Sequence, residues 1–281
     1  MGRIYHRPPM PLRKRQAQRS LACHTFGVEV EVALDDIELR ERVQEILPPG
    51  WKPADQRDST EAGGRFGLRD TGADSYEVTV DDVPWLEHAT LEVALGMLDA
   101  QIRIYVAANA RERIFVHAGV VTRGGMALVI PGESFSGKTT LVSALVRLGA
   151  TYYSDEYAVL DDEGRVHPYP RPLSIRGEDG TAPQERQVGA ALAAPAALAA
   201  VVVTRYRPGA EWQPTRLSPG QGVLALLANT VPAQERPQES LRAVSRAVAG
   251  AIVLESDRGE ARPAAESILE ALAAHGGSGR S

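Results

Sequence analysis

The chain has 281 residues, 43% of them hydrophobic, which is enough for one elaborated globular domain or for a core with a small N-terminal lobe. Its 36 acidic side chains outnumber the 31 lysines and arginines, and the formal net charge of -5 argues against a general nucleic-acid binder. The single cysteine, Cys23, excludes an intramolecular disulfide and a cysteine-rich zinc site. A chain with one cysteine fits a reducing compartment, so we expect a cytoplasmic protein.

The first 22 residues are rich in arginine and proline. They contain no apolar stretch of the kind that secretory signals require. We expect residues 1–22 to form a solvated, disordered arm, with a partner-docking arm as the alternative. The longest apolar tract, residues 188–203, contains Gly189 and Pro195 and is too short to span a bilayer, so we expect no membrane partner.

Residues 23–110 have the pattern of a small α+β lobe. Apolar and polar residues alternate over 25–34, which predicts a half-buried strand, and a helix is expected from 35 or 36 to 46. Two short alternating runs between 64 and 80 are separated by a turn-like segment, which predicts a hairpin. Apolar residues at helical spacing over 90–110 predict a closing helix with Thr90 as its N-terminal cap.

Residues 111–281 have the pattern of an α/β domain. Strands are expected at 114–121 and 126–130, joined by a glycine turn, and the second is continuously apolar, as in a strand buried on both faces. The further expected strands lie at 151–153, 157–160, 166–169, 199–204 and 251–254, and the expected helices at 140–148, 219–228, 238–249 and 263–274.

The segment after strand 126–130 matches the G-x-x-x-x-G-K-[ST] pattern of a phosphate-binding loop. Its glycines let backbone N–H groups point at phosphate oxygens, and the following helix adds the positive end of its dipole. We expect Lys138 to reach the β and γ phosphates of ATP and Thr139 to hold Mg²⁺. A chance glycine-rich loop is the alternative. The expected nucleotide-binding residues are Gly132, Glu133, Ser134, Phe135, Ser136, Gly137, Lys138, Thr139 and Thr140.

An acidic pair, Asp155 and Glu156, follows the expected strand 151–153. The carboxyl edge of an α/β sheet is where ligands bind, so these acids are candidate site residues. One of them can hold Mg²⁺ together with Thr139, for which we name Asp155, and either can accept the proton of an attacking hydroxyl. A solvated loop with two acids is the alternative.

Two further blocks accompany the loop and the acidic pair. They are His117 with Gly119, before the loop, and the run Leu173, Ser174, Ile175, Arg176 and Gly177. In these four blocks, with the loop from Gly132 to Thr139 and the pair Asp155 and Glu156, the chain resembles the catalytic domain of the HPr kinase/phosphorylase family. This resemblance implies an α/β P-loop kinase core of the HPr kinase and phosphoenolpyruvate carboxykinase type. Glu156 stands where the family has aspartate and Ser174 where it has glutamate, which suggests a diverged relative similar to lasso-peptide-associated kinases, with an acceptor other than HPr.

The resemblance also implies roles for two further residues. His117 would assist the acidic pair, with a structural strand histidine as the alternative, and Arg176 would clamp the transferring phosphoryl group, with a surface arginine as the alternative. The expected function is ATP-dependent, Mg²⁺-requiring transfer of the γ-phosphoryl group to a hydroxyl of a peptide, a protein serine or a small molecule. The alternatives are a nucleoside triphosphate hydrolase and a non-catalytic nucleotide-binding module. The family tends to assemble, so a homo-oligomer is a further expectation.

Overall fold

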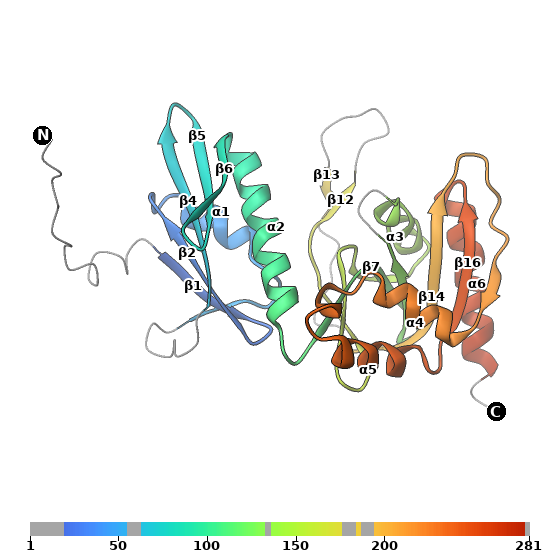
Figure 1. Ribbon diagram of the computed structural model, residues 1–281. Helices are drawn as coiled ribbons and strands as arrows, with labels where there is room; N and C mark the ends of the chain where they lie inside the picture. The colour runs from blue at the N-terminus through green and yellow to red at the C-terminus, as the bar shows by residue number, and fades with distance from the viewer. Residues whose placement is uncertain (1–19, 55–62, 133–135, 176–183, 187–193, 279–281) are drawn as a thin grey trace, which may run out of the picture. The chain divides into compact units, whose positions relative to one another are not determined.

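The structure, a computed structural model, describes residues 20–54, 63–132, 136–175, 184–186 and 194–278. The chain divides into two compact units, Met1–Val106 and Ala107–Ser281 (Figure 1). The boundary lies within helix α2 (Leu91–Asn109), close to residue 110 where the sequence predicts the small lobe to end. Each unit combines helices with a β-sheet, so the protein has a mixed α/β fold.

The first unit is built on a six-stranded sheet with the order β3-β1-β2-β4-β5-β6. All neighbouring strands are antiparallel except β2 and β4, which are parallel and lie on either side of α1 in the chain. The elements of this unit besides α2 are β1 (Ser20–Thr25), β2 (Val28–Leu34), α1 (Leu39–Ile46), β3 (Lys52–Pro53), β4 (Gly64–Gly72), β5 (Ser75–Val80) and β6 (Val83–Ala89).

One face of this sheet carries the core of the first unit. Along β2, Val28, Val30, Val32 and Leu34 are buried while the residues between them are more exposed, which is the period of two that the sequence predicts. The apolar stripe of α2 is also buried, from Leu95 to Val106. The helices α1 and α2 are neighbours, because Arg42 and Glu92 form an ion pair of 2.7 Å between them.

The first unit differs from expectation in three details. The strand predicted over 25–34 is confirmed as β2 from Val28 onward, but its first residues form a turn, because Phe26 and Gly27 both have positive φ and reverse the chain between β1 and β2. Strand β6 was not expected, since most of its residues are exposed and show no alternation. It follows another turn with positive φ, at Asp81 and Asp82. In addition, β1 begins at Ser20, within the segment 1–22 predicted as an arm.

The second unit is built on an eight-stranded mixed sheet with the order β11-β10-β7-β8-β14-β16-β15, in which β9 also pairs with β7. Strands β8, β14 and β16 run parallel. The strands are β7 (Ile114–Arg123), β8 (Met126–Pro131), β9 (Thr151–Ser154), β10 (Tyr157–Leu160), β11 (Val166–His167), β14 (Ala197–Tyr206), β15 (Thr215–Leu217) and β16 (Ile252–Arg258), with a separate pair β12 (Leu173–Ile175) and β13 (Gln184–Arg186).

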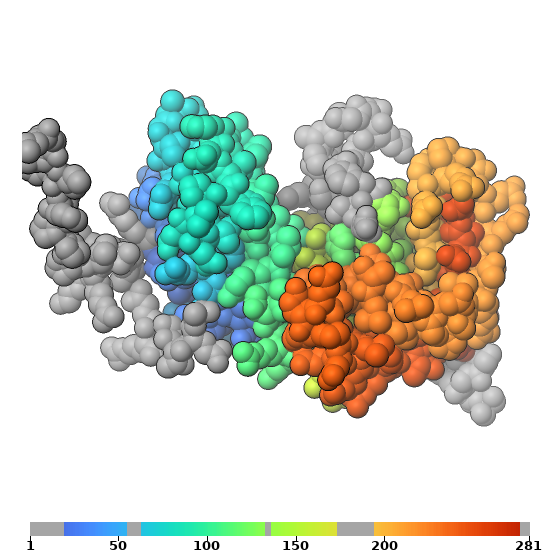
Figure 2. All heavy atoms as spheres, in the orientation of Figure 1, coloured from blue at the N-terminus to red at the C-terminus, as the bar shows by residue number. Residues whose placement is uncertain are grey.

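Helices cover both faces of this sheet. One core packs α3 (Lys138–Arg147) and α6 (Ala261–Ser278) against the sheet, and the other packs α4 (Pro219–Leu227) and α5 (Pro237–Val248) against the opposite face. Figure 2 shows α4 and α5 on the face of this unit toward the viewer. The predicted cap of α4 is confirmed, because Ser218 and Gln221 form a reciprocal capping box.

The strands of the second unit extend beyond their expected ends. Strand β14 reaches Tyr206 and β16 reaches Arg258, whereas the sequence predicts ends at 204 and 254. The hydrophobic pattern stops where these strands leave the core, so the polar ends carried no signal. Strands β12, β13 and β15 were also not expected. None of the described helices is both long enough and apolar enough to cross a membrane.

Candidate functional site

Strands β7, β8 and β9 bring the loop motif next to the acidic pair. Ala118 of β7 pairs with Pro131 at the end of β8, and Val120 of the same strand pairs with Ser154 at the end of β9. The two acids form the short link from β9 to β10, and the Ala118 N–H donates a 3.1 Å hydrogen bond to the Glu156 carbonyl. The phosphate-binding motif and the acids therefore meet across a single strand.

The described part of the loop has the backbone of a phosphate-binding turn. Gly137 has φ 83° and stands at the N-cap of α3, a left-handed conformation that glycine adopts without steric cost. Among the described residues no side chain caps this helix, so the N–H groups of its first turn are available to an anion. Lys138 is 7% exposed, and its Nζ donates a 2.6 Å hydrogen bond to the Gly132 carbonyl across the loop.

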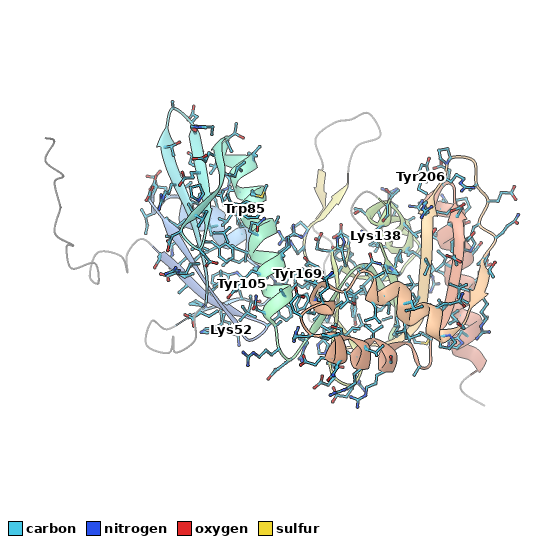
Figure 3. All side chains as sticks on the ribbon, viewed as in Figure 1. Lys52, Trp85, Tyr105, Lys138, Tyr169 and Tyr206 are labelled. Atoms are coloured by element: carbon cyan, nitrogen blue, oxygen red, sulfur yellow. The ribbon has the colours of Figure 1, made fainter. Side chains whose placement is uncertain are left out.

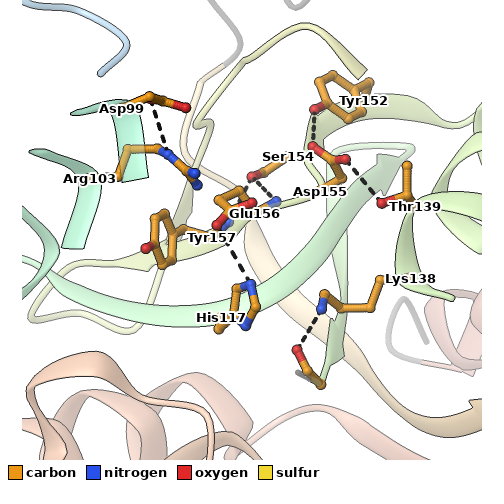
Figure 4. A network of polar contacts seen from close by, with 11 residues as sticks. Asp99, Arg103, His117, Lys138, Thr139, Tyr152, Ser154, Asp155, Glu156 and Tyr157 are labelled. Atoms are coloured by element: carbon orange, nitrogen blue, oxygen red, sulfur yellow. Dashed lines mark hydrogen bonds and ion pairs between the residues drawn. The ribbon is translucent and has the colours of Figure 1, made fainter. Parts of the chain in front are cut away.

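Asp155 is the centre of a hydroxyl network (Figure 4). Thr139 Oγ1 lies 3.2 Å from Asp155 Oδ2, and the Tyr152 hydroxyl lies 2.9 Å from Oδ1. The Tyr152 hydroxyl is also 3.0 Å from the Arg171 carbonyl, which fixes the ring between two acceptors. The sequence predicts only that Thr139 and Asp155 share a magnesium ion, and in the structure their side chains are in contact.

Burial sets the ionisation of this network. Desolvation raises the pKa of Asp155, the hydrogen bonds from Tyr152 and Thr139 lower it, the negative charge of Glu156 raises it, and the net pKa lies above the usual value. Burial beside Asp155 also raises the pKa of Tyr152, so its hydroxyl remains a donor. A buried carboxylate that is costly to ionise is stabilised by a cation placed beside it.

Glu156 and His117 form a second polar contact on the same side of the loop. His117 Nε2 lies 3.6 Å from Glu156 Oε1, because Glu156 directly precedes Tyr157, the residue of β10 that pairs with His117 of β7. The turn that presents the acids is held by Ser154, whose Oγ accepts hydrogen bonds from the N–H groups of Glu156 and Tyr157. We use the name acid flank of the loop for six residues, namely His117, Thr139, Tyr152, Ser154, Asp155 and Glu156.

The structure brings most of the expected site residues together. The described ones at the site are His117, Gly132, Ser136, Gly137, Lys138, Thr139, Asp155 and Glu156. Thr140 lies in the first turn of α3 with an exposed side chain. Four expected residues lie outside the described part of the chain, namely Glu133, Ser134, Phe135 and Arg176.

Sequence reasoning missed three residues of the site, namely Tyr152, Ser154 and Arg258. Tyr152 was read only as part of an apolar strand, although its position three residues before Asp155 could have suggested a contact across the strand end. Arg258 was missed because the strand that carries it was expected to end at Leu254. Its side chain is 2% exposed, and Nη2 donates a 2.7 Å hydrogen bond to the Gly137 carbonyl.

The donor set at Thr139 and Asp155 fits a magnesium ion. Mg²⁺ prefers hard oxygen ligands and is commonly held by one or two protein oxygens together with substrate phosphates and water. A hydroxyl and a carboxylate 3.2 Å apart at the start of the helix provide such a pair. In the described part of the chain, no three or more His, Cys, Asp and Glu side chains gather as a metal cluster.

Comparison with known protein families gives no matching family, and no curated protein is significantly similar to the chain.

Proposed function

We propose that the second unit is a P-loop kinase core that transfers the γ-phosphoryl group of ATP to a hydroxyl. The observation that carries this proposal is the contact between Thr139 and Asp155, 3.2 Å, at the start of the helix that follows the loop. It places a metal-binding hydroxyl, a buried carboxylate and the loop lysine at one end of β8. This arrangement is the one that phosphoryl transfer requires, because positioning and charge neutralisation supply most of its catalysis.

Lys138 and the first turn of α3 would bind the phosphates. The Lys138 ammonium donates to the Gly132 carbonyl, so the side chain lies across the loop. On binding it would exchange this contact for oxygens of the β and γ phosphates. The uncapped N–H groups of the helix would donate to the same phosphates.

Thr139 and Asp155 would hold Mg²⁺, which when bound neutralises charge on the β and γ phosphates. Tyr152 orients the Asp155 carboxylate by donating to Oδ1, which leaves Oδ2 facing the Thr139 hydroxyl. Asp155 thereby takes the role of metal ligand in this proposal, and the role of base goes to its neighbour.

Glu156 would accept the proton of the attacking hydroxyl. Its carboxylate is partly exposed, at 31% of its side chain, so an acceptor can reach it, and His117 lies 3.6 Å away. His117 would position this carboxylate and share the proton through its Nε2 atom. The four sequence blocks that resemble HPr kinase/phosphorylase support the same assignment. The acceptor is then a hydroxyl of a peptide, a protein serine or a small molecule.

The test compares nucleotide binding with phosphoryl transfer in two variants. The purified chain is incubated with Mg²⁺, γ-labelled ATP and a panel of serine peptides, free serine and polyols, and labelled products are identified by mass spectrometry. We expect Glu156→Gln to lose about 10²–10⁴-fold in transfer, which is the usual contribution of a general base. We expect its affinity for ATP with Mg²⁺ to stay within about tenfold of wild type.

The matched control is Glu163→Gln, an exposed acid in the turn between β10 and β11. It should leave both binding and transfer unchanged. Loss of ATP without a labelled acceptor would instead identify a hydrolase. Full transfer by both Asp155→Asn and Glu156→Gln would refute the assignment of the acid flank.

A further inference from the structure

The loop has a second flank, formed by the ends of β14 and β16. We call it the β14–β16 corner and define it as Ser136, Thr204, Tyr206 and Arg258. Tyr206 pairs directly with Arg258 in the parallel register of these strands. Thr204 lies two residues before Tyr206 on β14 and therefore on the same face of the sheet. Figure 3 shows Tyr206 at the end of β14, at the same edge of the sheet as Lys138.

Arg258 joins this corner to the loop. Its Nη2 donates to the Gly137 carbonyl at 2.7 Å, and Nη1 donates to the Gly259 carbonyl at 3.1 Å. Its guanidinium carbon lies over the Tyr206 ring, 5.6 Å from the centroid. A Cβ on Gly137 would lie 3.7 Å from the Tyr206 Cβ, so the tyrosine stands directly against the last glycine of the loop.

The corner keeps hydrogen-bonding capacity that the described chain does not use. Ser136 Oγ, Thr204 Oγ1 and Arg258 Nε are buried and have no hydrogen-bond partner among the described residues. Buried polar atoms without a partner are rare in folded proteins and require an explanation. On the acid flank, by contrast, the hydroxyls of Thr139, Tyr152 and Ser154 all have partners.

The direction of a bound nucleotide follows from the acid flank. The γ-phosphoryl group must face Glu156 and His117 for transfer, and it is the terminal group of the nucleotide. The nucleoside therefore leaves the loop away from the acids, across Gly137 and toward the end of β14. There it meets Tyr206, whose side chain is large and apolar yet 46% exposed.

We propose that Tyr206 is the stacking platform for the nucleobase, and that Arg258 holds this platform against the loop. This inference rests on the proposed binding of a nucleoside triphosphate. Arg258 covers one face of the ring, and the exposed remainder of the ring accepts the π face of a base.

The experiment measures two ligands by calorimetry in the presence of Mg²⁺: ATP, and inorganic triphosphate, which has the phosphates and no base. The proteins are wild type, Tyr206→Ala, Tyr206→Phe and Leu224→Ala. Leu224 is a matched control, because it is 67% exposed and lies on α4, on the opposite side of the sheet. A melting curve of each variant checks that it is folded.

We expect Tyr206→Ala to weaken ATP binding about tenfold and to leave triphosphate binding unchanged, since stacking on one aromatic ring is typically of this size. Tyr206→Phe keeps the ring and should bind both ligands like wild type, as should Leu224→Ala. If Tyr206→Ala lost equal affinity for both ligands, or lost no affinity for ATP, the assignment of Tyr206 as the stacking platform would be overturned. If wild type bound neither ligand, the proposed function itself would fail, which separates the two outcomes.

Discussion

The acid flank and the β14–β16 corner lie on opposite sides of the same loop and differ in how their polar groups are paired. On the acid flank the polar side chains contact one another. The hydroxyls of Thr139 and Tyr152 contact the Asp155 carboxylate, and His117 lies beside Glu156. In the corner three buried polar atoms have no partner among the described residues, and an aromatic ring is half exposed. The polar groups of the acid flank satisfy one another, whereas those of the corner have hydrogen-bonding capacity that a ligand could use.

This difference matches what the two ends of a nucleotide require. Transfer depends on groups fixed in advance, because charge that develops in the transition state is stabilised best by dipoles and donors that do not have to reorganise. Affinity for a base depends on an exposed apolar surface. Lys138 lies in the loop between the two flanks and would bind the phosphates in either case, so its removal tests both assignments together.

The largest combined effect on ligand binding and on transfer is expected for Lys138→Ala. The substitution removes a buried cation from the phosphates, so transfer should fall by about 10²–10³-fold or more, and both ATP and inorganic triphosphate should bind more weakly. The exposed lysine at position 52 offers the control, because Lys52→Ala removes the same charge outside the second unit. Near-normal transfer by a folded Lys138→Ala variant would exclude the loop as the phosphate site.

A smaller effect is expected for Arg258→Lys. Lysine keeps the charge, but its single ammonium cannot donate to the Gly137 and Gly259 carbonyls in the same geometry as the guanidinium. We therefore expect a loss of about 1–3 kcal/mol in the free energy of unfolding. The Michaelis constant for ATP should rise more than kcat falls, because Arg258 positions the loop without touching the reacting atoms. Arg262→Lys, at a side chain 80% exposed, should change neither.

The smallest effect, and the one with opposite sign, is expected for the stability of Asp155→Asn. The pKa of Asp155 is raised in the folded protein, so its ionisation destabilises the fold as pH rises above the usual value of 3.8. Asparagine carries no charge, so in chelator at pH 7 the variant should melt higher, by about 2–4 °C for each kcal/mol gained. The gain should shrink as pH falls and vanish below pH 3.8, where both side chains are neutral. A variant that melts lower than wild type at pH 7 would show that this acid stabilises the fold.

The acid flank, apart from Tyr152 and Ser154, could be predicted from sequence because its residues fall in motifs with fixed spacing. The glycines, Lys138 and Thr139 follow an apolar strand, and the acids follow the next one, so topology alone brings them to one edge. The helices and buried strands of the second unit were predicted for the same reason, since their apolar periodicity is strong. The closeness of His117 to Glu156 came only from the resemblance, and the strand pairing now accounts for it.

The β14–β16 corner could not be predicted because no local pattern marks it. Tyr206 and Arg258 are 52 residues apart and meet through the parallel pairing of strand ends that extend past the apolar core. Phe26 illustrates the same limit in the first unit, where an aromatic residue with φ 50° hides a turn within an alternating run. Tertiary pairing decided both cases, and composition gave no sign of either.

The most direct test of this difference between the flanks is a crystal structure with Mg²⁺ and a non-hydrolysable ATP analogue. We expect the γ-phosphate to lie beside Lys138 and face Glu156, the metal to contact Thr139 and Asp155, and the base to stack on Tyr206. A nucleotide bound in the reverse direction, with its base on the acid flank, would contradict the assignment of both flanks. An analogue bound away from the loop would contradict the proposed function as well.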